Sequence, residues 1–396
     1  MLSKKAMNIS PSPTLAISAK AKQMKSEGID VIGFGAGEPD FDTPDHIKEA
    51  AIKSIQEGFT KYTPAAGIPE LKKVVSEKFK KENGLEYSPN QIVISNGAKH
   101  SLDNVFAALL DPGDEVIIPA PYWVSYPEMV KLNDGVPVYI ETDSTTCFKV
   151  TREQLEKTLT PRTKALILNS PSNPTGQVYS REELEFIADF AVKNNVYVIS
   201  DEVYEKIIYD QVEHISIASL SPEIKELTIV VNAVSKTYSM TGWRIGYAAA
   251  PAELAAAMGD IQSHLTSNPN SMAQMAALAA ITGPQDDVEM MRKAFLERRD
   301  YMVNRVKEIP YLDCLTPPGS FYLFVEVGDT FGKSFRGKGI QNVDDFAEYL
   351  LTEYQVALVP GTAFGSPDCV RLSFATSMEN IQEGLKRIEA FTRELS

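Results

Sequence analysis

Short, nearly continuous apolar runs recur along the chain and are separated by helix-like segments. They are rich in Val, Ile, Leu and Ala and do not alternate between apolar and polar residues. Such runs are typical of strands that are covered on both faces, and therefore of a mostly parallel sheet. Helices on the two faces of that sheet would make an α/β sandwich. The runs cover residues 92–94, 115–118, 165–168, 196–200, 228–232 and 245–249.

Helix start and stop signals lie between these runs. Ser180-Arg-Glu-Glu183 is a capping box that precedes an amphipathic segment. Proline just inside a helix start and glycine just past its end mark further helices. We expect these to run from Ser12 to a stop at Gly28, from Thr43 as N-cap and Pro44 as first residue to Gly58, and from Ile68-Pro69 to Gly84.

The chain changes character after about residue 285. A long helix is expected over 285–307, strands over 321–325, 356–359 and 370–374, and a final helix over 378–394. This mixture indicates a smaller α+β domain. We predict an N-terminal segment (1–45) that joins the small domain, a large domain (46–288) and a small C-terminal domain (289–396).

Composition argues against several classes of protein. The 39 Lys and Arg residues against 53 Asp and Glu give a net charge of −14, whereas nucleic-acid binders show a basic stripe. Three widely spaced cysteines and four histidines without metal-ligand spacing predict neither a disulfide framework nor a metal site. No long apolar segment or signal-peptide pattern occurs. We expect a cytoplasmic protein that binds neither nucleic acid nor a membrane.

Polar side chains follow several of the predicted strands. In open α/β sheets, ligands gather outside the carboxyl ends of the strands. Asn173 lies in a loop after the run 165–168, Asp201 and Tyr204 follow the run 196–200, and Lys236 follows the run 228–232. Each has an ordinary alternative as a turn, a cap or a core residue, but together they predict one site.

The turn Ser95-Asn-Gly97-Ala98-Lys99 adds an anion site to this set. It follows the run 92–94 and opens a helix, whose free N–H groups and dipole favour a phosphate. A lysine for a Schiff base, an acid for a ring nitrogen, and a phenol and an amide for a ring oxygen fit one cofactor, pyridoxal 5′-phosphate. A desolvated lysine is the residue type that this chemistry needs.

Seven motifs extend over nearly the whole length. They are Gly37-Glu-Pro-Asp-Phe-Asp-Thr-Pro44, Lys61-Tyr-Thr-Pro-Ala-Ala-Gly-Ile-Pro-Glu-Leu71, Pro121-Tyr-Trp123, Asn173-Pro-Thr-Gly176, Ser200-Asp-Glu-Val-Tyr204, Ser235-Lys236 and Thr241-Gly-Trp-Arg-Ile-Gly246. With them the chain resembles the class I, pyridoxal-phosphate-dependent aminotransferases of fold type I, close to the prokaryotic aspartate aminotransferase branch. The resemblance implies a three-layer α/β/α large domain, a smaller α+β domain, and ping-pong transfer of an α-amino group, here from aspartate to 2-oxoglutarate.

The resemblance also implies roles at the cofactor. Lys236 would carry the Schiff base and move the proton, Asp201 would pair with the ring nitrogen, and Tyr204 and Asn173 would bind the ring oxygen. Trp123 would stack on the ring. The phosphate would be held by Gly97, Ala98, Lys99, Ser235 and Arg244, with Tyr62 reaching it from the neighbouring subunit of a homodimer.

For the substrate, the resemblance implies that Arg371 clamps the α-carboxylate with its planar fork. Trp123 and Asn173 would also contact the substrate, and Gly37 would offer its backbone N–H. The residue that reads the substrate side chain is not visible, with candidates in 10–15 and 264–270. Members of the branch that use prephenate carry a basic residue near the N-terminal Pro-Ser, where this chain has Ser10, so prephenate is disfavoured.

Three other functions are compatible with parts of the sequence. A nicotinamide dehydrogenase is suggested by Gly33-Phe-Gly-Ala-Gly37, which resembles a dinucleotide fingerprint, but no helix start follows these glycines. A carbon–sulfur β-lyase, a related elimination or racemisation enzyme, or an aminotransferase for aromatic or other amino acids would use the same cofactor and fold. A regulator with an aminotransferase-like domain is disfavoured by the absence of a basic DNA-binding module.

Overall fold

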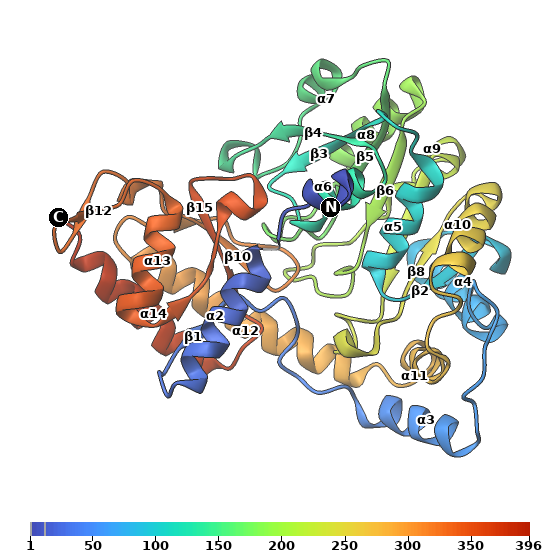
Figure 1. The fold of residues 1–396 in the computed structure, drawn as a ribbon, viewed down its shortest axis with the longest axis horizontal. Helices are drawn as coiled ribbons and strands as arrows, with labels where there is room; N and C mark the ends of the chain where they lie inside the picture. The colour runs from blue at the N-terminus through green and yellow to red at the C-terminus, as the bar shows by residue number, and fades with distance from the viewer. Residues whose placement is uncertain (1, 12) are drawn as a thin grey trace.

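The computed structural model describes residues 2–11 and 13–396. A large lobe is built on a seven-stranded sheet, and a smaller lobe lies beside it (Figure 1). The strands of the large sheet follow the order β2-β8-β7-β6-β5-β3-β4, and only β8 runs antiparallel to its neighbours. Their bounds are β2 Ile92–Ser95, β3 Glu115–Ala120, β4 Val136–Glu141, β5 Thr163–Asn169, β6 Tyr197–Asp201, β7 Thr228–Ala233 and β8 Gly246–Ala249.

Helices cover both faces of this sheet. Successive residues of β2 show this, because Ile92 and Ile94 pack into one apolar cluster and Val93 packs into another. The sheet is thus buried on both sides, which explains the continuous apolar runs in the sequence. The helices of the large lobe are α3 Asp45–Gln56, α4 Pro69–Asn83, α5 Ala98–Leu109, α6 Ser125–Leu132, α7 Arg152–Thr158, α8 Arg181–Asn194, α9 Pro222–Glu226, α10 Ala252–Leu265 and α11 Ser271–Thr282.

The smaller lobe contains a four-stranded antiparallel sheet in the order β14-β15-β10-β9. The N-terminal strand β1 pairs with β13, so an N-terminal segment joins the C-terminal part of the chain in this lobe, although the described chain begins beside α6 of the large lobe (Figure 1). Its elements, with the N-terminal helices, are α1 Lys4–Met7, α2 Pro13–Ser26, β1 Ile32–Gly33, α12 Asp286–Glu308, β9 Asp313–Cys314, β10 Tyr322–Glu326, β11 Ser334–Phe335, β12 Lys338–Gly339, α13 Val343–Tyr354, β13 Val356–Ala357, β14 Val359–Pro360, β15 Cys369–Ser373 and α14 Met378–Arg393.

The three-layer α/β fold with a second α+β lobe was predicted and is confirmed, and each predicted apolar run contains a strand. The capping box at Ser180 and the start of α4 at Pro69 are present as predicted. The domain boundaries at 45/46 and 288/289 stay a prediction. In the predicted helix from Ser12, α2 begins at Pro13, and Ser12 lies outside the described residues.

Two local predictions were wrong. Thr43 is not the N-cap of α3, because Pro44 occupies that position and the Thr43 hydroxyl donates to the Ser239 carbonyl instead. The run 356–359 is not one strand, since β13 and β14 pair with different partners. The edge strand β4 reads Val-Pro-Val-Tyr-Ile-Glu and was missed, because Pro137 interrupts its apolar run. Helices α6, α7, α9, α10, α11 and α13 were missed as well.

No helix in the described part of the chain is long and apolar enough to cross a membrane. The three cysteines are free, with Cys147 exposed and the other two buried.

Candidate active site

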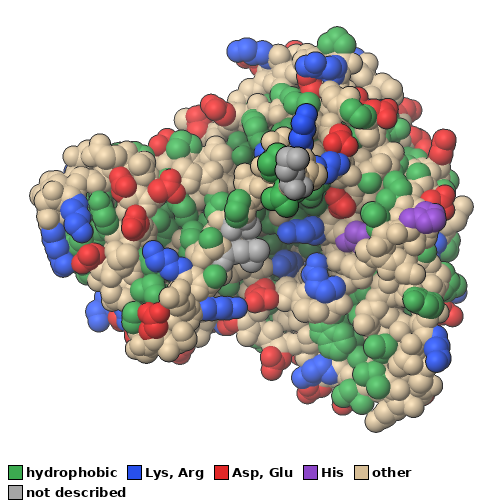
Figure 2. All heavy atoms as spheres, viewed as in Figure 1, with side chains coloured by type: hydrophobic (Ala, Val, Ile, Leu, Met, Phe, Trp, Pro, Cys, Tyr) green, Lys and Arg blue, Asp and Glu red, His purple; other side chains and the backbone are tan. Residues whose placement is uncertain are grey.

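A cavity of about 450 Å³ opens where the carboxyl ends of β5, β6 and β7 face the smaller lobe. Lys and Arg side chains gather near the centre of this face, between the two lobes (Figure 2). The cavity brings together most of the predicted site residues. Those that line it are Gly37, Ala98, Lys99, Trp123, Asn173, Asp201, Tyr204, Ser235, Lys236, Arg244 and Arg371.

Lys236 projects into this cavity from the segment after β7. Its ammonium donates a hydrogen bond to the Gly37 carbonyl at 2.5 Å. Burial lowers the pKa of Lys236 to about 8, with the Arg244 and Arg371 charges acting in the same direction and Glu38 and Asp201 opposing. The side chain is surrounded by protein but faces the cavity, and with this pKa about a tenth of the amine is neutral at pH 7.

Asp201 ends β6 and is almost completely buried. Its Oδ2 accepts a hydrogen bond from the Tyr126 hydroxyl at 2.7 Å, and its Oδ1 accepts one from the Val203 N–H at 3.3 Å. Burial raises the pKa of Asp201 to about 6, although both hydrogen bonds act to lower it. A carboxylate placed here is costly unless a positive partner approaches it.

Tyr204 reaches the cavity from the turn after β6. Its hydroxyl lies 3.0 Å from the hydroxyl of Tyr322, which comes from β10 in the smaller lobe. Burial, together with the neighbouring phenol and Asp201, raises the pKa of Tyr204 well above its usual value, so it stays a neutral hydrogen-bonding group.

Arg371 lies on β15 and is only 3% exposed. Its Nη1 donates to Asn173 Oδ1 at 2.8 Å, and its Nη2 donates to the Gly35 carbonyl at 3.0 Å. Its Nε has no partner among the described residues, and no carboxylate there forms an ion pair with it. The alternative of a surface salt bridge is therefore wrong, because a buried, unpaired guanidinium is a site that invites an anion.

The turn before α5 is built for close approach. Gly97 has a φ of +85°, and a Cβ there would come within 2.2 Å of the Arg244 guanidinium. Arg244 donates to the Thr241 carbonyl at 2.9 Å and to the Asn96 carbonyl at 3.3 Å. The guanidinium is thereby held beside the free N–H groups at the start of α5, a combination of groups that suits an anion.

Lys99 and Trp123 line the cavity together. The Lys99 ammonium lies 5.0 Å from the centroid of the Trp123 ring. Burial lowers the pKa of Lys99, and the charge of Arg244 acts in the same direction. The side chain thus lines the cavity while it remains exposed to solvent.

Two predicted site residues, Tyr62 and Gly97, are not among the residues that line the cavity. Tyr62 is 89% exposed. Gly97 contacts the site through Arg244.

Several lining residues were missed from the sequence. Asn169 ends β5, and its amide donates to the backbone carbonyl of Asp201 at 2.9 Å. Because ligands gather at the carboxyl ends of strands, its position at the end of β5 could have identified it. Tyr126 and Tyr322 carry no comparable signal, because they come from α6 and from the smaller lobe. Thr14, from the candidate range 10–15, also lines the cavity, whereas no residue of 264–270 is among the described lining residues. The remaining missed residues that line the cavity include Ser18, Lys22 and Glu38.

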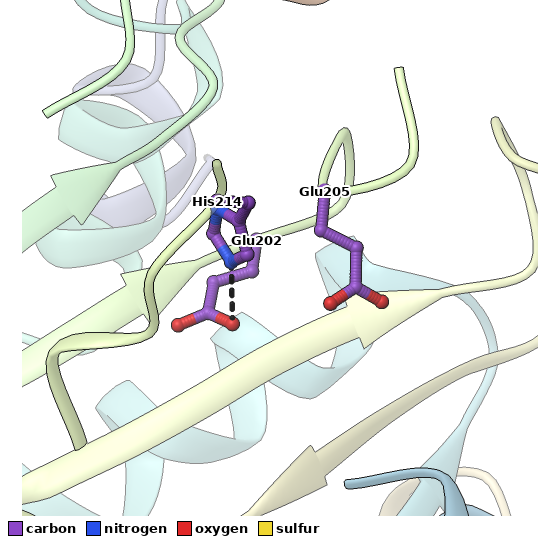
Figure 3. A group of neighbouring side chains, drawn as sticks. All are labelled: Glu202, Glu205 and His214. Atoms are coloured by element: carbon purple, nitrogen blue, oxygen red, sulfur yellow. Dashed lines mark hydrogen bonds and ion pairs between the residues drawn. The ribbon is translucent and has the colours of Figure 1, made fainter. Parts of the chain in front are cut away.

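In the segment that follows β6, the side chains of Glu202, Glu205 and His214 lie close enough together to hold a metal ion (Figure 3). Their carboxylates are already bound, however. Glu205 pairs with the buried ammonium of Lys78, and Glu202 accepts from His214 at 3.1 Å and from two serine hydroxyls. The charges of Lys78 and His214 overcome burial and lower the pKa of Glu205 to about 2. These side chains therefore form a buried network of ion pairs and hydrogen bonds.

Comparison with known proteins places this geometry in a family. Residues 29–388 match the model of the family aminotransferase class I and II. The chain is 54% identical to the aspartate aminotransferase of Bacillus sp. (strain YM-2), with 99% of each chain covered. It is 50% identical to a probable aspartate/prephenate aminotransferase of Rickettsia felis, over 98% of this chain and 96% of that one.

Solved structures agree with this assignment. The aspartate aminotransferase of Rhizobium meliloti matches with a TM-score of 0.97 and 46% identity over all of both chains. The whole length of the chain is thus accounted for by one architecture. The chain belongs to the class I and II aminotransferases and, within them, to the branch of the prokaryotic aspartate aminotransferases.

Proposed function

We propose that this aminotransferase binds pyridoxal 5′-phosphate in the cavity and exchanges amino groups between L-aspartate and 2-oxoglutarate. The donor set fits that cofactor. The start of α5 with Arg244 suits the phosphate, buried Asp201 suits a protonated ring nitrogen, and Lys236 offers an amine of lowered pKa. When bound, pyridoxal phosphate supplies an aldehyde that condenses with amines and a ring that withdraws electrons.

Lys236 has the properties of both a nucleophile and a proton carrier. Its pKa near 8 keeps part of the amine neutral and ready to attack a carbonyl. Once its nitrogen is released, the same side chain can take a proton from the substrate Cα and return it elsewhere, since a base with a pKa near the working pH is the most effective.

Around the ring, Asp201 would supply the negative charge that a protonated ring nitrogen needs, and its own burial would strengthen that attraction. Tyr204 and Asn173 would donate to the ring oxygen, and Trp123 would cover one ring face. Ala98 and Ser235, which line the cavity, and the turn at Gly97 would complete the phosphate site.

Arg371 is the residue that supports the proposal most directly. A buried guanidinium with an unpaired Nε and no carboxylate partner in the described chain lies beside Asn173. A substrate α-carboxylate would satisfy it in two-pronged fashion. Gly37 lies at the same wall of the cavity, and its N–H would contact that carboxylate.

The charge of the cavity supports a dicarboxylic substrate. Cationic side chains outnumber acidic ones in its lining, although the chain as a whole carries a charge of −14. Such a cavity concentrates anions. We propose that Lys99, which lines the cavity beside Trp123, meets a second carboxylate of the substrate rather than the cofactor phosphate. The cations are Lys22, Lys99, Lys236, Arg244 and Arg371, and the acids are Glu38 and Asp201.

We further propose a homodimer in which Tyr62 reaches the partner's phosphate site. The support is its exposure, together with that of Ile52, Ile55 and Phe59 nearby in the sequence, which form an apolar set without cover in the single chain. Sedimentation that gives a monomer at micromolar concentration would contradict this. The predicted cytoplasmic location fits the three free cysteines.

Half-reactions test the function. Aspartate should convert the yellow, cofactor-loaded enzyme to its pyridoxamine form, and 2-oxoglutarate should restore it. Release of pyruvate and ammonia from cystathionine would indicate the β-lyase instead. A series of donors and acceptors compared by kcat/KM, with prephenate included because one relative is named for it, would define the range. Prephenate used as well as 2-oxoglutarate would contradict the argument from Ser10.

A further inference from the structure

Tyr126 and Asp201 form a pair whose purpose the proposed function does not explain. The Tyr126 hydroxyl donates to Asp201 Oδ2 at 2.7 Å, and both side chains line the cavity. Tyr126 is 1% exposed and Asp201 is 4% exposed, so solvent does not compete for this hydrogen bond. A charge-assisted hydrogen bond in such surroundings is strong and directional.

The position of the phenol is fixed by packing. Tyr126 lies at the start of α6, and its ring packs edge-on against Trp123, with centroids 5.3 Å apart and an interplanar angle of 86°. The same ring belongs to an apolar cluster with Ile118 and Ile167 of the sheet. The hydroxyl therefore meets Asp201 without a further loss of side-chain freedom.

We propose that Tyr126 is a positioning residue: it fixes Asp201 Oδ2, so that Oδ1 is presented to a positively charged ring nitrogen, and it helps to keep that carboxylate ionised. The inference rests on the proposed function. Among the described residues, Oδ1 receives only the Val203 N–H, at 3.3 Å, and it retains a lone pair for a second donor.

The electrostatic surroundings agree with this role. Burial and the charge of Glu202 raise the pKa of Asp201, whereas the Tyr126 hydrogen bond and the charge of Lys236 lower it. Burial, and then the charge of Asp201, raises the pKa of Tyr126 well above its usual value. Tyr126 thus remains a donor across the working range of pH. Its removal would take away one of the groups that lower the pKa of Asp201, so burial and the charge of Glu202 would raise that pKa further.

The test is the pH dependence of cofactor binding by the apoprotein. Pyridoxal phosphate would be titrated into wild type and Tyr126→Phe between about pH 5 and pH 9, with Trp123 fluorescence and visible absorbance as readouts. Tyr209→Phe is the matched control, because Tyr209 is equally buried and loses a hydrogen bond to the Ser320 carbonyl, yet does not line the cavity.

We expect affinity in wild type to fall as the pH drops through about 6, where Asp201 takes up its proton. In Tyr126→Phe this fall should begin about one pH unit higher, which makes binding about fivefold weaker near pH 6, about tenfold weaker near pH 5 and nearly unchanged near pH 8.5. The titration of the cofactor itself is common to all three proteins and cancels in the comparison.

A Tyr126→Phe profile that coincides with wild type, a loss of affinity that is equal at every pH, or an equal shift in Tyr209→Phe would overturn the proposal. Absence of binding in wild type at every pH would instead remove the proposed function, and with it this role. Circular dichroism and thermal unfolding of both variants would identify a variant that fails to fold. In that case Tyr126→Trp, which retains an aromatic N–H donor, should restore folding and part of the profile, and failure to restore the profile would also overturn the proposal.

Discussion

Arg371 on β15 of the smaller lobe donates a hydrogen bond to Asn173, which belongs to the loop after β5 of the large lobe, at 2.8 Å. The bond joins the proposed carboxylate clamp to a proposed ligand of the cofactor ring. The two lobes therefore share the site, and a change in either residue should affect both binding steps.

Replacing Arg371 by Lys should lower kcat/KM for aspartate by about 100-fold or more, because an ammonium keeps the charge but loses the planar fork. Steady-state kinetics would measure this. Arg299→Lys is the matched control, since Arg299 is equally buried but pairs with Asp210 and Asp300 away from the cavity. It should reduce stability and leave kcat/KM within a few-fold. An Arg371→Lys enzyme with wild-type kcat/KM would contradict the clamp.

Replacing Lys236 by Ala should leave the fold intact and reduce turnover by about four orders of magnitude or more, because both the nucleophile and the proton carrier are lost. Rapid-mixing half-reactions with aspartate would measure the rate. The exposed Lys338→Ala serves as control. Turnover of the Lys236→Ala enzyme close to wild type would refute the central assignment.

Asp201 should make the apoprotein's stability depend on pH. Its pKa is raised from 3.8 to about 6 in the folded state. The folded state therefore binds this proton more tightly, and the resulting stability is present below about pH 4 and is lost as the pH rises through about 6. Asp201→Asn apoprotein should be more stable than wild type at about pH 7.5 by up to about 3 kcal/mol, with the difference vanishing near pH 4.

Urea unfolding of the two apoproteins across this range would measure that difference. The same Asp201→Asn variant should lose most of its aminotransferase activity, because a neutral amide cannot hold a ring nitrogen in its protonated form. A variant that is less stable than wild type at every pH would show that ionised Asp201 does not destabilise the folded state.

Replacing Lys99 by Met should lower kcat/KM for aspartate by about 10- to 100-fold and change kcat/KM for alanine by only a few-fold, because only aspartate has a second carboxylate. Met keeps the apolar stem against Trp123 and removes the charge. Competition between the two substrates would measure the ratio. An equal loss for both would instead place Lys99 at the phosphate.

Strand-end reasoning located the core of the site because local rules apply to it. Asp201 ends a buried strand, Lys236 and Asn173 follow shortly after buried strands, and carboxyl ends of parallel strands meet at one edge. Tyr322 could not be found in this way. It lies on a strand of the smaller lobe, and its place beside Tyr204 depends on how the lobes pack, which no local pattern encodes.

The misplaced elements have a similar explanation. Strand β4 has Pro137 in the middle of its apolar run, which argues against a strand, but β4 lies at the edge of the sheet and pairs only with β3, where proline is tolerated. Thr43 is a residue type that often caps helices, but its hydroxyl donates to the carbonyl of Ser239, which is distant in the sequence. In each case a tertiary contact overrides a local preference.

The buried, uncompensated charge of Arg371 also has a practical consequence for handling the protein. A ligand that neutralises it binds only the folded state, so occupancy of the cavity should be reported directly by the melting temperature. A thermal-shift screen of carboxylates would then rank candidate substrates by the length and charge of their chains, before any turnover assay is available.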